Sequence, residues 1–235
     1  PASRLREDRF IRWLDDVAPQ AEAIYLMGDL FDFWFEYRTV IPKGFARLFG
    51  KLAALTDQGI PVHLFRGNHD VWAFHYLEEE VGIILHREPE VMSYAGRTFY
   101  LAHGDGLGPG DQGYKLLKKV FECRLCQWMF RWFHPDLGTR LGLYLSRRSR
   151  LANVAREGKP EKSAGPENEM LVSYARDASE RMPEIDYFVF GHRHLPLEMQ
   201  LSEKASLYLL GDWVVNFTYG VFDGHTFSLH EYRPA

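Results

Sequence analysis

The stretch Val62-His63-Leu64-Phe65-Arg66-Gly67-Asn68-His69-Asp70 decides the fold, because an apolar run leads directly into residues of the kinds that bind metals. A short apolar run closed by glycine predicts a strand that ends in a tight turn. That turn presents an amide oxygen, an imidazole and a carboxylate on successive residues. Alone it is only a turn, so its meaning depends on whether the design recurs.

The same design occurs three more times, at Ile24-Tyr25-Leu26-Met27-Gly28-Asp29, Phe99-Tyr100-Leu101-Ala102-His103-Gly104-Asp105 and Tyr187-Phe188-Val189-Phe190-Gly191-His192-Arg193-His194. Ligand sites of open α/β sheets lie at the carboxyl ends of the strands. Carboxylate, amide oxygen and imidazole together suit Mn, Fe or Zn better than metals that prefer thiolates. The sequence therefore predicts a metal site built from Asp29, Asn68, His103, His192 and His194.

Helical and strand patterns alternate through the first third of the chain. Helices are predicted over residues 4–18 and 44–58, and strands over 23–28 and 62–66, a rhythm typical of a sheet covered by helices. Further along we expect a hairpin of strands 89–94 and 97–102, a helix over 169–181, and strands near 187–190, 206–210, 213–218 and 226–232. The prediction is an α/β fold of layered β-sheets flanked by helices.

Composition limits the class of protein. The 235 residues are 46% hydrophobic and 26% charged, which fits one main domain. A net charge of -4 argues against a dedicated nucleic-acid binder. No apolar run approaches the ~18 residues of a membrane span. Residues 115–162 nevertheless hold twelve Lys or Arg and only four Asp or Glu, which predicts a basic face for an anionic partner.

The same region is unusually apolar. Residues 114–133 are predicted to form one helix, and ten of the fourteen residues from Val120 to Phe133 are apolar. Such a helix is either buried in a core or a dimer interface, or contacts something apolar. Residues 139–151 continue the pattern and add Arg147, Arg148 and Arg150.

The two cysteines, Cys123 and Cys126, lie within this apolar helix. Two cysteines exclude a disulfide framework and fit a reducing compartment. A Cys-x-x-Cys pair can be redox-active or form half of a zinc site. The apolar surroundings favour plain packing.

Taken together, the strand-end segments resemble four of the five motifs of the calcineurin-like metallophosphoesterases, in their usual order. They are Gly28-Asp29-Leu30-Phe31-Asp32, Gly67-Asn68-His69-Asp70, His103-Gly104-Asp105 and Gly191-His192-Arg193-His194. The resemblance implies a metallophosphoesterase-type fold that holds two divalent ions, for which we expect Mn²⁺. Asp29 would bridge the two ions.

The resemblance also implies the other roles. Asn68, His103 and His192 would hold one ion, and His194 would help to hold the other. His69 would face the phosphoryl group, oriented by the carboxylate of Asp32.

The fifth motif, Asp-x-His on a first strand, is absent from the sequence. Asp8-Arg9-Phe10 is no substitute, because it lies in a helical pattern and lacks the histidine. We expect a strand that carries this motif to precede Pro1.

Within the superfamily the chain most resembles the UDP-2,3-diacylglucosamine hydrolases of lipid A synthesis. The resemblance rests on Trp34 after Asp29-Leu30-Phe31, on Asp111 and Gly113-Tyr114 after His103-Gly104-Asp105, on the long helical insertion, and on Leu210-Gly211-Asp212-Trp213. It implies cleavage of the pyrophosphate of a UDP-linked diacylated glucosamine to UMP and a lipid phosphate. The implied enzyme is cytoplasmic and peripheral to the inner membrane.

The resemblance divides the chain into a core, residues 1–113 and 166–235, and an inserted helical lid, residues 114–165. The lid would contact the acyl chains, and its basic residues would face an anionic membrane surface. The residues expected to contact substrate are Asp111, Tyr114, Arg147, Lys159 and Lys162.

Two alternatives stay open. Many enzymes of this group have Arg at the position of His69 and Glu at the position of Asp32, so a phosphoesterase for another phosphodiester or nucleotide is possible. The missing first motif also allows a lipid-binding scaffold with a relict metal site.

Overall fold

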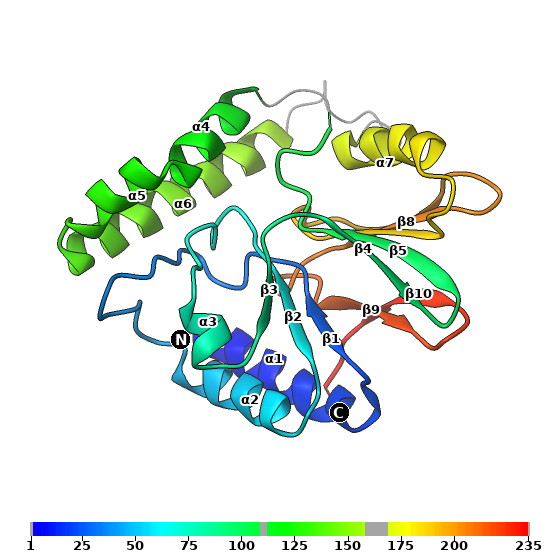
Figure 1. The fold of residues 1–235 in the computed structure, drawn as a ribbon, viewed down its shortest axis with the longest axis horizontal. Helices are drawn as coiled ribbons and strands as arrows, with labels where there is room; N and C mark the ends of the chain where they lie inside the picture. The colour runs from blue at the N-terminus through cyan, green and yellow to red at the C-terminus, as the bar shows by residue number, and fades with distance from the viewer. Residues whose placement is uncertain (1, 109–111, 158–168, 235) are drawn as a thin grey trace.

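A computed structural model describes residues 2–108, 112–157 and 169–234 and confirms the α/β fold, in which β-sheets are flanked by helices (Figure 1). The first sheet is parallel, with the order β1-β2-β3. Its strands are β1 (Ile24–Leu26), β2 (Val62–Phe65) and β3 (Ile84–His86). Helices α1 (Ala2–Val17) and α2 (Ala46–Asp57) cover it, and Leu14, Leu52 and Leu64 are fully buried there. The short helix α3 (Tyr76–Glu79) leads into β3.

The second sheet has five strands in the order β4-β5-β6-β8-β7. The strands are β4 (Glu90–Tyr94), β5 (Arg97–Ala102), β6 (Tyr187–Phe190), β7 (Pro196–Gln200) and β8 (Ser206–Leu210). The three central strands are parallel, and the two edge strands are antiparallel to their neighbours. Helix α7 (Met170–Arg181) packs on this sheet, where its Leu171 and Val172 join a core with Phe188 and Phe190.

A third core cluster lies between the two sheets. Met27 and Phe65 come from the first sheet, and Phe99 and Val189 from the second. The hairpin β9 (Thr218–Phe222) and β10 (Phe227–Glu231) adds further apolar side chains to this cluster. The two sheets pack across this apolar layer so that β1, β2, β5 and β6 end at one common rim.

One edge of β1 faces a cavity instead of a strand. In the described part of the chain β1 pairs with β2 alone. The cavity beside it measures about 1460 Å³ and is lined by residues 20–33 and by parts of α1, the second sheet and β9.

Helices α4 (Gln112–Glu122), α5 (Arg124–Arg131) and α6 (Pro135–Glu157) lie together at one end of the molecule, apart from α1 and α2 (Figure 1). The prediction of one helix over 114–133 is wrong, because the chain is extended at Cys123. In a continuous helix the carbonyl of Phe121 would accept a bond from residue 125. Here it accepts bonds from Trp72 Nε1 at 2.8 Å and Gln127 Nε2 at 2.8 Å.

Most other predicted elements are confirmed, including the hairpin of β4 and β5. The strand predicted over 213–218 is wrong. The carboxylate of Asp212 accepts hydrogen bonds from the backbone N–H groups of Val214, Val215 and Asn216, which makes a turn, and β9 begins only at Thr218. Strands β3 and β7 were not predicted; both are edge strands, and their burial does not follow a simple alternation.

Candidate metal centre

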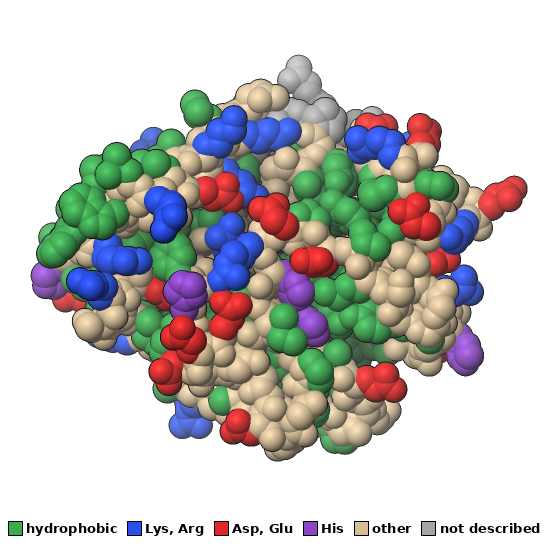
Figure 2. Space-filling model, in the orientation of Figure 1, with side chains coloured by type: hydrophobic (Ala, Val, Ile, Leu, Met, Phe, Trp, Pro, Cys, Tyr) green, Lys and Arg blue, Asp and Glu red, His purple; other side chains and the backbone are tan. Residues whose placement is uncertain are grey.

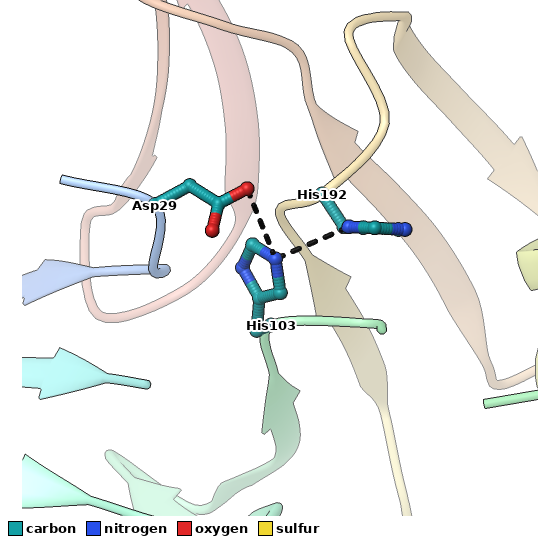
Figure 3. Close-up of side chains that lie close together, drawn as sticks. All are labelled: Asp29, His103 and His192. Atoms are coloured by element: carbon teal, nitrogen blue, oxygen red, sulfur yellow. Dashed lines mark hydrogen bonds and ion pairs between the residues drawn. The ribbon is translucent and has the colours of Figure 1, made fainter. Parts of the chain in front are cut away.

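Four strand ends meet at the rim between the sheets, as the sequence predicts. Asp29 follows β1 and Asn68 follows β2, so both come from the first sheet. His103 follows β5 and His192 follows β6, so both come from the second. The side chains of Asp29, His103 and His192 point toward one another across this junction (Figure 3).

Asp29, His103 and His192 form a group that could hold a metal ion, with one ligand atom from each residue within 4.8 Å of the others. His103 Nε2 lies 3.5 Å from Asp29 Oδ2 and 3.2 Å from His192 Nδ1. Asn68 Oδ1 joins the group at 3.3 Å from His103 Nε2. Four of the five predicted ligands are therefore in contact through one imidazole.

The orientation of the His103 ring is fixed by a buried backbone contact. His103 is only 4% exposed, and its Nδ1 lies 2.6 Å from the carbonyl oxygen of Met27. Nδ1 must donate its proton there, which leaves Nε2 to face Asp29 and His192. A histidine that donates from one nitrogen to a carbonyl and presents the other is the usual arrangement of a metal ligand.

Burial and the neighbouring charges shift the pKa values of Asp29, His103 and His192. Burial alone would raise the pKa of Asp29, but His103, His69 and His192 hold it well below its usual range. Burial alone would lower the pKa of His103, but Asp29 and Asp105 raise it to about 9. Burial and the neighbouring His103 lower the pKa of His192 to about 4. Asp29 and His103 therefore stabilise each other's charged forms, and the charge of His103 disfavours a charge on His192.

The backbone around these ligands is strained and tightly packed. Asp29 and His192 adopt positive φ angles of 53° and 60°, a backbone conformation that is uncommon for non-glycine residues. A Cβ atom on Gly28 would overlap the His103 ring, and one on Gly67 would overlap the Asp29 carboxylate. Glycine at these two positions is what allows the strand ends to approach each other.

Asp70 joins two of the strand-end loops. Its side chain is completely buried and accepts the N–H of Gly67 at 2.5 Å and the N–H of Leu30 at 2.9 Å. Burial and the charge of Asp29 raise its pKa to about 7. The motif Gly67-Asn68-His69-Asp70 includes Asp70, but this role was not predicted from the sequence. The position of Asp70 directly after the other motif residues was the signal that could have indicated it.

His69 lies against the metal group through its backbone. Its N–H donates to Asp29 Oδ1 at 2.9 Å, and its carbonyl accepts the N–H of Trp34 at 3.0 Å. Asp32 lies on the same loop as Trp34 and is exposed. The loops that carry the predicted pair are therefore bonded to each other, and the pairing of the two side chains stays a prediction.

His194 lies outside the group of ligand atoms. Its ring is 62% exposed, and its Nδ1 lies 3.4 Å from Asp212 Oδ2. Burial alone would raise the pKa of Asp212. Hydrogen bonds from His194 and from the backbone N–H groups of the turn instead hold it far below its usual range. The role of Asp212 was not foreseen, because it depends on the contact between two distant loops.

Two of the five predicted substrate-binding residues, Tyr114 and Arg147, lie in the part of the chain that the structure describes. Tyr114 donates to the buried carboxylate of Asp105 at 2.5 Å, and Lys118 lies 2.9 Å from the same carboxylate, so Asp105 ties α4 to the core. Arg147 is exposed on α6. Asp111, Lys159 and Lys162 lie outside the described residues.

Comparison with known proteins places these motifs in one family. The profile of the family described as Calcineurin-like phosphoesterase matches residues 6–196. The chain is 38% identical over 242 residues to a UDP-2,3-diacylglucosamine hydrolase of Porphyromonas gingivalis, covering 95% of this chain and 88% of that protein. It is 30% identical over 208 residues to the hydrolase of that name from Aeromonas hydrophila, covering 86% of this chain and 82% of that protein.

Among solved structures, Vps29 of Entamoeba histolytica in complex with zinc is 12% identical, with a TM-score of 0.39 over 93% of this chain and 79% of that one. This similarity is too weak to bear on the site.

Proposed function

Because this chain belongs to the calcineurin-like phosphoesterase family, we propose that it hydrolyses the pyrophosphate of UDP-2,3-diacylglucosamine to UMP and 2,3-diacylglucosamine 1-phosphate. The observation that carries the proposal is the 38% identity over 95% of the chain to a hydrolase of that name, together with ligands gathered where its motifs meet. Phosphoester hydrolysis is the activity that the description of the family gives.

The donor set fits divalent ions, and Mn²⁺ is our proposed choice. Asp29, His103 and His192 offer one carboxylate and two imidazoles, with Asn68 as an oxygen donor beside them. Bound divalent ions supply Lewis acidity at the phosphoryl oxygens and lower the pKa of water. The raised pKa of His103 means that this residue must release its proton to act as a ligand.

His69 is proposed to act on the phosphoryl group. Its backbone is bonded to Asp29, so its side chain starts from a position next to the metal group. An imidazole there can donate a hydrogen bond to a phosphoryl oxygen as negative charge builds up. Asp32 would orient the imidazole.

The helices α4–α6 are proposed to be the lid for the acyl chains. Phe130 packs on Phe35 with ring centroids 4.7 Å apart, which fixes the inner side of the lid against the core. The outer side leaves large apolar residues in solvent, including Trp128, which is 55% exposed, and Trp132, which is 73% exposed. Figure 2 shows hydrophobic side chains gathered at this end of the molecule with Lys and Arg among them.

The outer surface of the lid supports a peripheral contact with an anionic membrane. The enzyme is proposed to be cytoplasmic and to bind the inner membrane through this surface. Tryptophans suit the membrane interface, and nearby Arg side chains such as those of Arg124, Arg140, Arg147 and Arg148 are attracted to anionic lipids. In the described parts of the chain, no helix is both long and apolar enough to cross a membrane.

The second ion is proposed to lie on the side of Asp29 that faces the cavity beside β1, with His194 helping to hold it. Asp29, His192 and His194 all line that cavity.

The activity is tested by measuring UMP release from UDP-2,3-diacylglucosamine by the purified protein with Mn²⁺. Asp29→Asn and His69→Ala are expected to lose at least about 10²-fold in kcat, because Asp29 would hold the metal ions and His69 would donate a hydrogen bond to the phosphoryl group. Thr226→Ala, in the exposed turn between β9 and β10, serves as the control. Absence of UMP with the metal sites filled would contradict the substrate.

The lid is tested by comparing the lipid substrate with UDP-glucosamine that lacks acyl chains. We expect a much higher kcat/KM for the lipid, and a loss of this preference in the Trp128→Ala/Trp132→Ala double variant. Equal turnover of both substrates by the unaltered enzyme would contradict the acyl-binding role.

A further inference from the structure

Cys123 and Cys126 lie at the break between α4 and α5, where the packing expected from the sequence is not found. Cys123 is exposed and Cys126 is half-buried. They are the two cysteines of the whole chain. Two thiols that are accessible and close together need another explanation than core packing.

Cys123 occupies the N-cap of α5. Its backbone is extended, with φ -65° and ψ 115°, and its carbonyl accepts the N–H of Gln127 at 3.0 Å, the first bond of the new helix. The nearby backbone N–H and thiol of Cys126, with the N–H of Leu125, lower the pKa of the Cys123 thiol. The neighbouring Cys123 raises the pKa of the Cys126 thiol.

The two sulfurs are within reach of each other. The Cα atoms of residues three apart on a helix lie about 5 Å from each other. A disulfide spans Cα separations of about 4.4–6.8 Å, so this spacing allows one. Cys123 is the exposed thiol at the helix N-terminus, where a thiolate is favoured, and Cys126 lies about one helical turn further along α5.

A metal site explains the positions of Cys123 and Cys126 less well than a disulfide does. Two thiolates supply half of a tetrahedral zinc site. In the ranges that the structure describes, the group of potential metal ligands is that of Asp29, His103 and His192, and the cysteines have no third ligand beside them.

The break itself is tied to the metal-binding loop. Glu122, the last residue of α4, lies 3.3 Å from Arg66, which directly precedes Gly67. The carbonyl of Phe121 accepts the indole N–H of Trp72, two residues after Asp70. A change at Cys123 would therefore occur next to the segment that carries Asn68 and His69.

We propose that Cys123 and Cys126 form a reversible intramolecular disulfide by exchange with small disulfides such as oxidised glutathione. The thiolate of Cys123 attacks one sulfur of the small disulfide, whose S–S bond breaks and releases a thiolate. The sulfur of Cys126 loses its proton to solvent and attacks Cys123, which expels the second small thiolate. The pair loses two electrons and two protons, and one small disulfide is reduced to two thiols. The proposal does not depend on the hydrolase activity.

The test equilibrates the purified chain at pH 7 with mixtures of reduced and oxidised glutathione, quenches with acid, alkylates and measures the intact mass. We expect a single transition to a monomer that lacks two hydrogens and takes up no alkylating agent. In the reduced chain, Cys123 should react at least about tenfold faster than Cys126, because more of it is thiolate.

Serine variants separate the two roles. Cys126→Ser should accumulate a stable mixed disulfide with glutathione on Cys123, because nothing resolves it. Cys123→Ser should form this adduct at least about tenfold more slowly, and it should stay folded because serine is a favourable N-cap residue.

Four results would overturn the proposal. They are a chain that stays reduced in every glutathione mixture, a disulfide between two chains, an unresolved mixed disulfide in the unaltered chain, and stoichiometric zinc binding that both serine variants abolish.

Discussion

At the scale of single residues, His103 of the second sheet contacts both the backbone and the charge of the first sheet. Its Nδ1 is held by the carbonyl of Met27, and its Nε2 faces Asp29 from the opposite sheet. An imidazole that is buried and fixed on one side has little rotational freedom left to lose on metal binding. The site is therefore preorganised in the metal-free chain.

Asp70→Ala should loosen two loops at once. The buried carboxylate accepts backbone N–H groups from Gly67 and Leu30, and its removal leaves both donors without this acceptor. We expect a loss of about 1–3 kcal/mol in the free energy of unfolding, measured in urea, and weaker Mn²⁺ binding.

Asp223→Ala is the matched control for that experiment. Asp223 also accepts two backbone N–H groups, from His225 and Thr226, but in an exposed turn. It should leave Mn²⁺ affinity unchanged. Equal Mn²⁺ affinity of the Asp70 variant and the unaltered chain would contradict the role given to Asp70.

His63 should make the stability of the protein depend on pH. Its Nδ1 lies 2.8 Å from His86 Nε2 and its ring stacks on Tyr25. Burial and His86 lower its pKa below the ordinary value of 6.5. The folded state therefore favours the neutral ring, and this stability is present above about pH 6.5 and lost as the pH falls below it.

His63→Phe keeps a stacked ring but cannot titrate. Between about pH 7 and 5, its urea midpoint should fall less than that of the unaltered chain. The exposed His225→Gln serves as the control and should follow the unaltered chain. Parallel curves for all three proteins would contradict the assignment to His63.

At the scale of elements, the lid depends on glycines where α6 meets the core. A Cβ atom on Gly138 would overlap the hydroxyl of Tyr37, and one on Gly142 would overlap the ring of Phe33. The two glycines are one helical turn apart, so they form a smooth stripe on α6. The stripe allows the helix to lie directly on the aromatic loop that follows β1.

Gly142→Ala should push α6 away from Phe33. Overpacking of this kind costs about 1–3 kcal/mol, and it should appear as a lower thermal midpoint and faster proteolysis within α4–α6. Gly113→Ala is the control, because a Cβ atom there meets nothing within 4 Å. That variant should be neutral or slightly stabilised, since alanine favours a helix. Identical behaviour of the two variants would show that α6 does not rest on Phe33.

At the scale of the whole molecule, the metal group lies at the rim of the apolar layer between the two sheets. Asp29 belongs to one sheet, and His103 and His192 belong to the other. A bound ion would therefore cross-link the two halves of the core, in addition to its chemical role.

Mn²⁺ should raise the thermal midpoint of the chain. Binding to the folded state alone stabilises it by about 2.7 kcal/mol when the free ion is at 100 times its Kd. A chelator should reverse the shift, and Asp29→Asn should abolish most of it. The control Asp223→Ala should keep the shift in full. A midpoint that does not respond to Mn²⁺ in the unaltered chain would contradict a metal site at this rim.

The pattern of residues along the chain was enough to predict the α/β class and the strand ends that meet at the rim. Each motif is local, because an apolar run followed by Gly28-Asp29 or Gly67-Asn68 specifies a strand and its turn together. The carboxyl ends of strands then gather by the geometry of the sheet. The β4–β5 hairpin was also predictable, since Ala95-Gly96 joins two neighbouring strands.

Tertiary contacts decided what local patterns could not. The apolar run through Cys123 reads as one helix, yet it breaks because Trp72, about fifty residues earlier, donates to the carbonyl of Phe121. His194 turns to Asp212, and Asp70 bonds to the loop after β1, through contacts between segments far apart in the sequence. Helical and strand patterns follow from periodicity within one segment, whereas a backbone break or a buried carboxylate depends on donors that only the folded chain brings near.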